Sequence, residues 1–378
     1  MRILVLGAGL QGSAAAYDLL QQSPVERVTV ADLKPDRVPP FLRPHVGRRL
    51  ALVKVDVQDA AALRETIRGH DAVLCALPYY YNLDVTRAAL EAGVRSADLG
   101  GNTEIVFQQK KLDPEARACG VSALPDCGLA PGLVNVLAAE GIRRVGEAQV
   151  VKIYVGGLPQ HPEPPLQYQI VYSLEGALDY YTSPSWVLRH GKPTRMDALS
   201  ELEQVAFPPP VGMLEAFHTG GGVSTLPWTY EGKVQTMEYK TLRYPGHAAI
   251  MRAVRDLGLL ELKPLRVKGK EVVPRDVFIA AVSPRLTKPE GRDLVALRVE
   301  VRGRDGREVV WQLLDYFDEA RGISAMMRTT GFSLAIVGVM LVDGRIAAPG
   351  VHTPDEAVPF AEYLGELARR RIEVREIQ

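Results

Sequence analysis

A chain of 378 residues is longer than a single ordinary hydrophobic core needs, so about two domains are expected. Its 45 basic residues balance 45 acidic ones, so neither nucleic acid nor an anionic membrane is expected as a partner. Three cysteines are too few for a disulfide framework or a cysteine-rich zinc site, so no metal is expected. With no room for a signal peptide and no apolar segment near the roughly twenty residues that span a bilayer, we expect a cytoplasmic protein.

The first residues carry the strongest motif in the sequence. An apolar run over residues 2–6 predicts a buried parallel strand, and it breaks into Gly-x-Gly-x-x-Gly before a helix. Gly7 permits the turn, Gly9 lets the backbone approach a pyrophosphate, and Gly12 lets the helix pack closely. The positive end of that helix favours a bound diphosphate. The predicted cofactor loop consists of Gly7, Gly9, Leu10, Gln11 and Gly12.

A second strand over residues 28–31 ends at Asp32, twenty residues after Gly12. A carboxylate at this position accepts hydrogen bonds from the adenosine ribose hydroxyls and repels a 2′-phosphate. NAD is therefore the predicted cofactor. Lys34 and Arg37 follow closely and keep NADP possible.

Two further strands extend the predicted sheet. The strand over residues 50–57 places Asp56 and Val57 where they flank the adenine, although Asp56 fits an N-cap of the helix over residues 60–68 equally well. The strand over residues 71–78 ends in small residues, which suits either close approach of the nicotinamide ribose or simple packing. The residues assigned to that approach are Cys75, Ala76, Leu77 and Pro78.

Candidate catalytic side chains follow the next strand ends. Tyr79 and Tyr80 leave the fourth strand directly, so at least one hydroxyl should point into the crevice. A fifth strand ends at Asp98, the leading catalytic candidate, although an aspartate satisfied by backbone N–H groups in a turn is the alternative. A helix over residues 105–119 and a sixth strand then complete a Rossmann half, and Cys127 beyond them is expected to be a wall of the substrate pocket.

From Gln149 the pattern changes to alternating strands, which predicts a second, mixed or antiparallel α/β domain. The Asp-Gly turn at 305–306 predicts a hairpin, and the free face of such a sheet suggests a homodimer. The predicted strands are 149–155, 271–273, 276–282, 294–302 and 308–316.

The segment over residues 328–342 is apolar on nearly all sides and must be buried. We expect it to return to the Rossmann sheet. The predicted division is therefore residues 1–132 and 325–378 for the dinucleotide-binding domain and residues 133–324 for substrate binding and dimerisation.

Two stretches of the second domain, 220–230 and 239–247, are rich in glycine, hydroxyls and aromatic residues, which suits a pocket better than a core. Arg243 offers a planar fork for a carboxylate. His247 is either a proton carrier near neutral pH or the start of a helix. The substrate-binding candidates in the first stretch are Gly221, Gly222, Ser224 and Thr225.

Four motifs, at 7–12, 126–132, 224–230 and 241–247, resemble the saccharopine dehydrogenase family, and most of all its L-lysine 6-dehydrogenase branch. The resemblance spans nearly the whole sequence. It implies a Rossmann domain split around a mixed α/β domain, NAD-linked oxidation of a C–N bond in the side chain of an amino acid, and a dimer.

Carried onto this sequence, the resemblance implies that Asp98 and the Tyr79–Tyr80 segment line the catalytic crevice. Arg243 and the 221–225 loop would hold the substrate. Some family members place a lysine just after the proline of the fourth strand. This sequence has tyrosines there, so no lysine acid/base role transfers.

The predicted reaction is oxidative deamination of the ε-amino group of L-lysine to allysine, which cyclises to piperideine-6-carboxylate, with release of ammonia. Asp98 is expected to act as the base, Tyr80 or His247 as the second proton carrier, and Arg243 as the carboxylate anchor.

Two alternatives stay open. One is the same chemistry on a secondary amine, as in saccharopine or a carboxyalkyl polyamine, with Arg189, Lys192 and Arg195 as sources of a second carboxylate clamp. The other is a non-catalytic NAD-binding sensor, although two elaborated polar loops would serve little purpose in a sensor.

Overall fold

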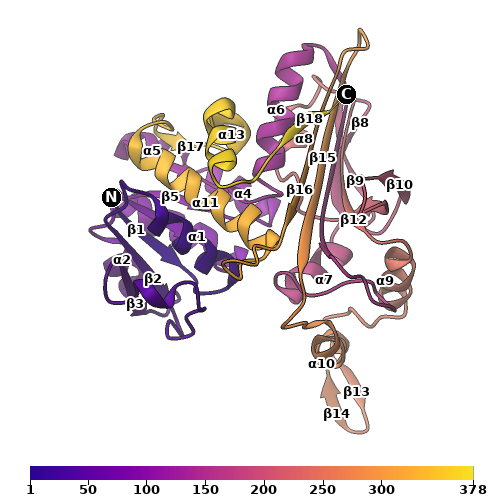
Figure 1. The fold of residues 1–378 in the computed structure, drawn as a ribbon, viewed down its shortest axis with the longest axis horizontal. Coiled ribbons are helices and arrows are strands. Elements are labelled where there is room, and N and C mark those ends of the chain that lie inside the picture. Colours follow the sequence, from indigo (N-terminus) through magenta and orange to yellow (C-terminus); the bar gives the residue numbers. More distant parts are fainter. Residues whose placement is uncertain (378) are drawn as a thin grey trace.

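The computed structural model describes residues 1–377, and its first part is a parallel seven-stranded sheet in the order β17-β6-β5-β4-β1-β2-β3 (Figure 1). The apolar runs predicted as strands form its centre because both faces of the sheet are covered by helices. The strands are β1 (Arg2–Leu6), β2 (Arg27–Asp32), β3 (Leu50–Lys54), β4 (Ala72–Cys75), β5 (Arg95–Asp98), β6 (Ser122–Leu124) and β17 (Gly350–Val351). The predicted α/β fold with a Rossmann-like sheet is confirmed.

The helices of this part connect successive strands. The helix predicted over residues 105–119 is two helices instead, because Pro114 lacks an N–H and begins a new helix at its first turn. These elements are α1 (Leu10–Gln21), η1 (Arg43–His45), α2 (Ala60–Ile67), η2 (Tyr79–Tyr81), α3 (Asn82–Glu91), α4 (Thr103–Lys110) and α5 (Asp113–Cys119).

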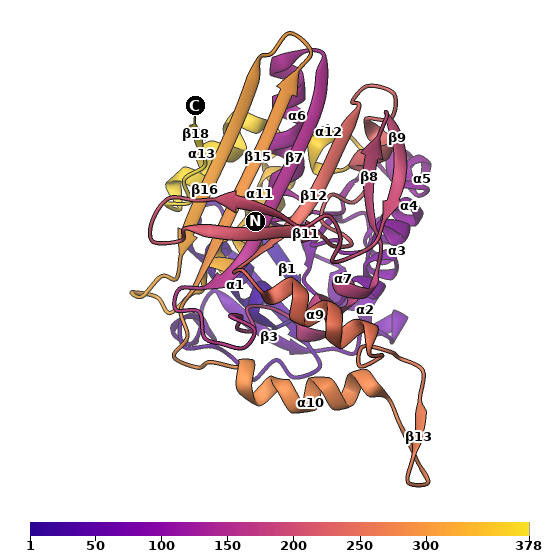
Figure 2. The same cartoon turned by 90° about the vertical axis from the view of Figure 1, so that its right-hand side faces the viewer.

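A mixed nine-stranded sheet forms the second part (Figure 2). Its path is β10-β11-β12-β7-β15-β16-β18, with β8 and β9 attached beside β12. The central strand β7 runs parallel to β12 and antiparallel to β15, and the predicted hairpin joins β15 to β16. The strands are β7 (Ala148–Pro159), β8 (Ser185–Arg189), β9 (Lys192–Met196), β10 (Glu203–Ala206), β11 (Met213–His218), β12 (Thr236–Arg243), β15 (Asp293–Gly303), β16 (Glu308–Tyr316) and β18 (Arg375–Ile377).

The strand predicted over residues 276–282 is wrong. This segment lies in the helix α10 (Pro274–Leu286), which has Pro274 in its first turn and Asp276 near its positive end. The short strands β13 (Leu265–Val267) and β14 (Lys270–Val272) form an exposed hairpin that projects from the body beside α10 (Figures 1 and 2). The other helices of this part are α6 (Leu133–Val145), α7 (Leu174–Thr182), α8 (Leu226–Thr229) and α9 (His247–Asp256).

The helix α11 (Ala325–Asp343) is long and apolar enough to cross a membrane by length and composition, which corrects the expectation that no segment approaches that length. However, 89% of its apolar window is buried inside the protein. A Cβ atom on Gly331 would lie 2.7 Å from the Cβ of Ala14, so α11 and α1 pack at very short range. This helix is therefore part of the core, where the sequence pattern placed it.

The C-terminal segment takes part in both sheets. After α11 the backbone adds β17 to the edge of the first sheet, and it then forms α12 (Pro354–Ala357) and α13 (Phe360–Arg369). The last strand, β18, pairs instead with β16 of the second sheet. This segment thus links the two sheets, whereas the sequence pattern assigned all of it to the first.

Candidate active site

The Gly-rich loop is built to receive a ligand at the start of α1. The N-cap residue Gly9 has no side chain that could cap the helix, and no acidic residue lies in the first turn, so the positive end of the helix is not neutralised. A Cβ atom on Gly12 would lie 1.9 Å from the carbonyl oxygen of Gly7, whereas one on Gly9 would meet no atom within 4 Å. The open space is therefore at Gly9, where a diphosphate is expected to approach.

Neighbouring side chains agree with a dinucleotide at this loop. Both polar atoms of the Gln11 amide are buried and have no hydrogen-bond partner within residues 1–377. Leu10, the first residue of α1, is 51% exposed. Asp32 accepts hydrogen bonds from the backbone N–H groups of Ala8 and Lys34, both at 2.8 Å, and so fixes the loop against the end of β2. These residues fit the cofactor that the fingerprint predicts.

The other predicted cofactor residues follow the same sheet edge. Asp56 is exposed and accepts a hydrogen bond from the N–H of Gln58 at 3.0 Å, in a turn that precedes α2. Val57 is half-buried beside it, and Leu77 and Pro78 continue the edge beyond β4. The buried Cys75 thiol has its pKa raised to about 12 by burial and is therefore neutral. Cys75 is a buried core residue at the end of β4, next to the sheet edge where the cofactor is expected to bind.

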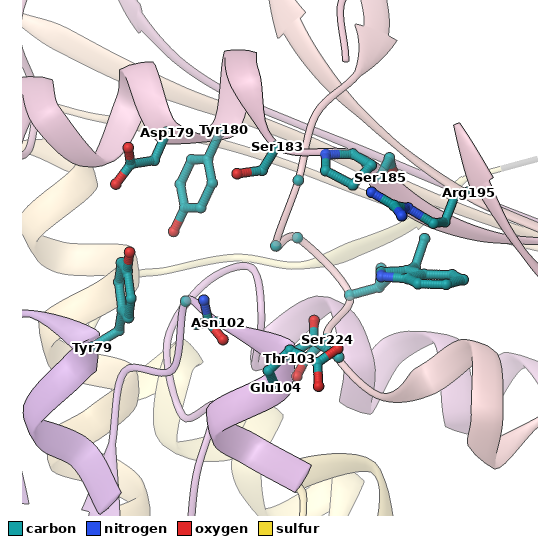
Figure 3. A pocket seen from close by; sticks show the side chains of 17 residues that line it. Tyr79, Asn102, Thr103, Glu104, Asp179, Tyr180, Ser183, Ser185, Arg195 and Ser224 are labelled. Atoms are coloured by element: carbon teal, nitrogen blue, oxygen red, sulfur yellow. The ribbon is translucent and has the colours of Figure 1, made fainter. Parts of the chain in front are cut away.

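A cavity of about 320 Å³ lies beside this edge, between the first sheet's loops and the second part of the protein (Figure 3). Four parts of the protein form it: the start of η2, the start of α4 with the residues before it, the end of α7 with β8 and β9, and the glycine-rich loop at 220–224. The lining residues are Tyr79, Gly101, Asn102, Thr103, Glu104, Asp179, Tyr180, Ser183, Pro184, Ser185, Trp186, Arg195 and 220–224.

Two of the charged lining residues have no ion-pair partner among the described residues: Arg195 on β9 and Glu104 on α4. The Arg195 guanidinium lies 5.8 Å from the centre of the Trp186 ring, which holds it by a cation–π contact. The third, Asp179, is paired with Arg275. The cavity therefore offers one free cation and one free anion within residues 1–377.

Asp98 does not face this cavity. Its Oδ1 accepts hydrogen bonds from Asn82 at 3.0 Å and from the N–H of Gly100 at 2.7 Å, and its Oδ2 accepts one from Gln109 at 2.7 Å. Burial raises the pKa of Asp98 to about 6, and these donors oppose the rise. With its oxygens occupied, Asp98 holds the loops after β5 and β6 together, which is the turn alternative that the sequence left open.

The two predicted tyrosines after β4 lie in different surroundings. Tyr79 lines the cavity, and Figure 3 shows its side chain on the side of the cavity opposite Arg195. Tyr80 is 57% exposed and lies outside the lining. Of this pair, Tyr79 is the one that can contact a substrate.

Arg243 and His247 are not among the residues that line the cavity. The Nε of Arg243 donates to the Tyr181 hydroxyl at 3.2 Å, and the guanidinium stacks on Tyr168 at 4.8 Å. Both ring nitrogens of His247 are occupied, by Tyr181 and by the carbonyl of Leu166, each at 2.9 Å. Burial, aided by Arg243, lowers the pKa of His247 to about 3, so this histidine is a neutral part of the core at the start of α9 and not a proton carrier.

Only some of the predicted substrate-binding residues line the cavity. Gly221, Gly222 and Ser224 line the cavity, but Thr225 and Cys127 are buried beyond it. A Cβ atom on Gly222 would lie 2.2 Å from the Tyr239 ring, so only glycine allows the loop to pack here.

Asp126 is the first residue of the motif at 126–132, and the sequence assigned it no role. Its side chain is fully buried, and neither carboxylate oxygen has a hydrogen-bond partner among the residues that the structure describes. It lies against Gly100, where a Cβ atom would be 1.9 Å from its Oδ1. Burial raises its pKa to about 8. The only sequence signal is its place just after β6, next to the end of β5, where Asp98 is the last strand residue.

Comparison with known proteins identifies the two halves. Residues 3–124 match the saccharopine dehydrogenase NADP binding domain, and residues 128–372 match the saccharopine dehydrogenase C-terminal domain. The first half is therefore an NAD(P)-binding domain.

Three relatives illustrate the similarity. The mitochondrial alpha-aminoadipic semialdehyde synthase of Mus musculus is 24% identical over 93% of this chain, which spans 45% of the synthase. The carboxyaminopropylagmatine dehydrogenase of Synechocystis is 22% identical, with 97% of this chain and 96% of the relative covered.

The third is the NADP(+)-dependent, L-glutamate-forming saccharopine dehydrogenase of Saccharomyces cerevisiae, which is 22% identical over 93% of each of the two proteins. The solved apo structure of the L-Glu-forming enzyme from this yeast superposes on the full length of both proteins with a TM-score of 0.79 at 20% identity. The fold is thus shared along the full length. The chain belongs to the saccharopine dehydrogenase family.

Proposed function

We propose that this protein oxidises the side-chain amine of an amino acid with NAD(P), and that L-lysine, deaminated at its ε-amino group to allysine with release of ammonia, is the substrate. One observation carries the proposal: the cavity beside the cofactor edge presents one free cation and one free anion among the described residues, Arg195 and Glu104. An α-amino acid head group carries one carboxylate and one ammonium and matches this pair. A guanidinium that lies near Trp186 and has no ion-pair partner among the described residues is suited to a carboxylate.

Gly7, Gly9 and Gln11 would hold the nicotinamide cofactor, which would supply a hydride acceptor when bound. The protein itself has to orient the amino acid, exclude water and take a proton from the amine, because a protonated amine cannot release a hydride from its carbon. Tyr79 and Tyr180 form the wall opposite Arg195, and burial raises the pKa of both hydroxyls, so they are neutral donors at physiological pH. Binding the head group at Arg195 fixes which carbon reaches the cofactor edge.

Secondary amines are the second candidate, because the relatives carry names such as saccharopine dehydrogenase and carboxyaminopropylagmatine dehydrogenase. Saccharopine carries additional carboxylates that need cationic partners. Arg189, one of the residues considered for a second clamp, is tied to Glu201 and Glu238, and Lys192 lies outside the lining. The single free cation in the described lining favours lysine over saccharopine.

The test is reduction of NAD and of NADP by the purified protein with L-lysine, L-ornithine, saccharopine and diamines. Lysine oxidation with one ammonia released per reduced cofactor is the expected result. Turnover of saccharopine alone would show that the substrate is a secondary amine, the second candidate, and not lysine. Cofactor binding without turnover of any amine would contradict the proposed function.

Arg195→Met is expected to raise the KM for lysine about 10–100-fold with a much smaller change in kcat. The reason is the loss of a charge-assisted bond to the carboxylate, worth about 1.5–3 kcal/mol. Steady-state kinetics measure this split. Lys192→Met is the matched control, since Lys192 is exposed on the same strand and lies outside the cavity lining. An unchanged KM in Arg195→Met would remove Arg195 as the anchor.

Asp32→Ser is expected to shift cofactor preference from NAD towards NADP by at least about tenfold. The native carboxylate repels a 2′-phosphate, whereas serine does not, and Lys34 follows closely. Dissociation constants of both cofactors, measured by fluorescence titration, give the ratio. Because Asp32 also fixes Ala8, Asp32→Asn serves as the control that keeps an acceptor for the N–H of Ala8.

A further inference from the structure

Exposed apolar side chains are concentrated in one segment of the protein, between the end of α9 and the first turn of α10. Nearly half of the large apolar residues that are exposed within residues 1–377 lie in this segment, with exposed fractions from 43% to 78%. Large apolar patches on a protein surface mark sites of contact with another molecule. The six residues are Leu257, Leu259, Leu262, Leu265, Val267 and Val277.

The hairpin of β13 and β14 in the middle of this segment is amphipathic. Its register pairs Leu265 with Val272 and Val267 with Lys270. Paired residues share a face of a sheet and neighbours along a strand alternate, so Leu265, Val267 and Val272 form an apolar face. Leu265 is 55% exposed and Val267 is 49% exposed, so the rest of the described protein leaves this face uncovered. A two-stranded hairpin in this state is only marginally stable in water.

The base of the hairpin is fixed to the body of the protein. Arg275, just after β14, is buried, and its Nε donates to the carbonyl of Leu260 at 3.0 Å. The same guanidinium pairs with Asp179 on α7, a residue that lines the cavity. The strands beyond this anchor project away from the body (Figures 1 and 2). The apolar face is therefore available to a second molecule.

The charges of the hairpin are arranged so that it complements itself. Lys268 and Lys270 lie at its tip, whereas Glu261 and Asp276 lie at its base. All four are exposed, and none has an ion-pair partner among the residues that the structure describes. A two-fold symmetric contact brings the same surface of two copies together, and antiparallel hairpins then place the tip of each beside the base of the other. Opposite charges meet at both ends of such a contact.

The exposed area is also of the size that a dimer contact needs. The six side chains together expose about 600 Å², compared with roughly 800 Å² that each partner buries in a standard interface. The mixed sheet, whose free face the sequence suggested as a dimer surface, offers less. Met213 and Tyr316 are the only large apolar residues exposed on its strands within residues 1–377.

We propose that β13 and β14, with the flanking residues 257–262, form a homodimer interface in which two hairpins lie antiparallel and cover each other's apolar faces. Lys270 of one copy then lies beside Glu261 of the other, and the symmetric pair forms at the opposite end. This interface is independent of the substrate that the enzyme oxidises. Through Arg275 and Asp179, it is joined to the wall of the cavity.

Sedimentation velocity of the full-length protein tests the apolar contact. Wild type is expected to be a dimer at about 10 µM. The double variant Leu265→Ser with Val267→Ser should raise the dissociation constant of the dimer at least about 100-fold, because four apolar side chains are lost from one interface. Leu202→Ser is the matched control, since Leu202 is 52% exposed but lies in the loop before β10. A monomeric wild type, or a double variant that stays dimeric, would overturn the proposal.

A charge exchange tests the antiparallel arrangement. Lys270→Glu and Glu261→Lys should each weaken the dimer about 5–20-fold, because each places like charges together at both ends of the contact. The variant that carries both substitutions should return to within about threefold of wild type, since the pairs form again with reversed sign. A combined variant weaker than either single variant would exclude the antiparallel arrangement. Binding of a monomeric wild type to phosphatidylserine vesicles would assign the hairpin to a membrane surface instead and overturn the proposal.

Discussion

Gly9→Ala is expected to weaken NAD(P) binding about 100-fold while the protein keeps its wild-type melting temperature. An added Cβ meets no atom of the protein within 4 Å, and the backbone of Gly9, with φ of −70°, suits alanine. The methyl group instead occupies the space at the uncapped start of α1, where the diphosphate has to approach the backbone. Fluorescence titration with NADH and thermal unfolding measure the two quantities separately.

Gly12→Ala and Gly365→Ala complete this comparison. The first should lose both cofactor binding and stability, because its Cβ would lie 1.9 Å from the carbonyl oxygen of Gly7. The second adds a methyl group on the surface of α13, where nothing lies within 4 Å, so it should leave cofactor binding unchanged and raise the free energy of unfolding by about 0.5–1 kcal/mol, because alanine favours a helix interior over glycine. Normal cofactor affinity in Gly9→Ala would show that the ligand does not lie over this glycine.

Asp315→Ala is expected to lower the free energy of unfolding by about 3–5 kcal/mol. Asp315 on β16 binds the guanidinium of Arg328 on α11 through two hydrogen bonds, at 2.8 and 3.1 Å, and both side chains are buried. Alanine leaves a buried cation that cannot lose its proton, with Asp318 at 3.5 Å as the remaining carboxylate. Urea unfolding at neutral pH measures the loss.

The double variant Asp315→Leu with Arg328→Met should recover most of that loss, because it removes both charges and fills their volume. Glu308→Ala is the control on the same strand. Its partner Arg302 is exposed, and breaking an exposed pair should change stability by less than about 1 kcal/mol. Equal losses from Asp315→Ala and Glu308→Ala would mean that the buried pair does not join α11 to the second sheet.

Local patterns sufficed to predict six of the seven strands of the first sheet, whereas β17 was not predicted. Most of these six are short apolar runs, and at Gly7 and Gly12 an added Cβ would come too close to backbone atoms of the protein. The wrong strand at 276–282 also has a local origin, because residues 277–282 form a short apolar run that fits a strand, whereas Pro274 just before it marks the start of a helix. Family motifs supplied the architecture of the second half.

The site was harder to predict because it depends on contacts between distant segments. Asp98 and Asp126 lie at the ends of neighbouring strands of the first sheet. Asn82 and Gln109 donate hydrogen bonds to Asp98, whereas the Asp126 oxygens have no partner among the described residues. The sequence near the two aspartates does not show this difference. The same holds for the choice between Arg243 and Arg195: the first is enclosed by tyrosines and the second lines the cavity. Residue type identified the candidates, and only the packing separated them.

The way α11, β17 and β18 close the two sheets has a consequence for synthesis of the protein. The helix α11 covers α1 at the contact between Gly331 and Ala14, and β17 completes the first sheet, so the cofactor-binding half lacks a wall until about residue 350 has been made. The second sheet, likewise, gains its last strand only from 375–377. Neither half can complete its packing before these segments have been made, and the growing polypeptide keeps the apolar face of α1 uncovered until α11 has been made.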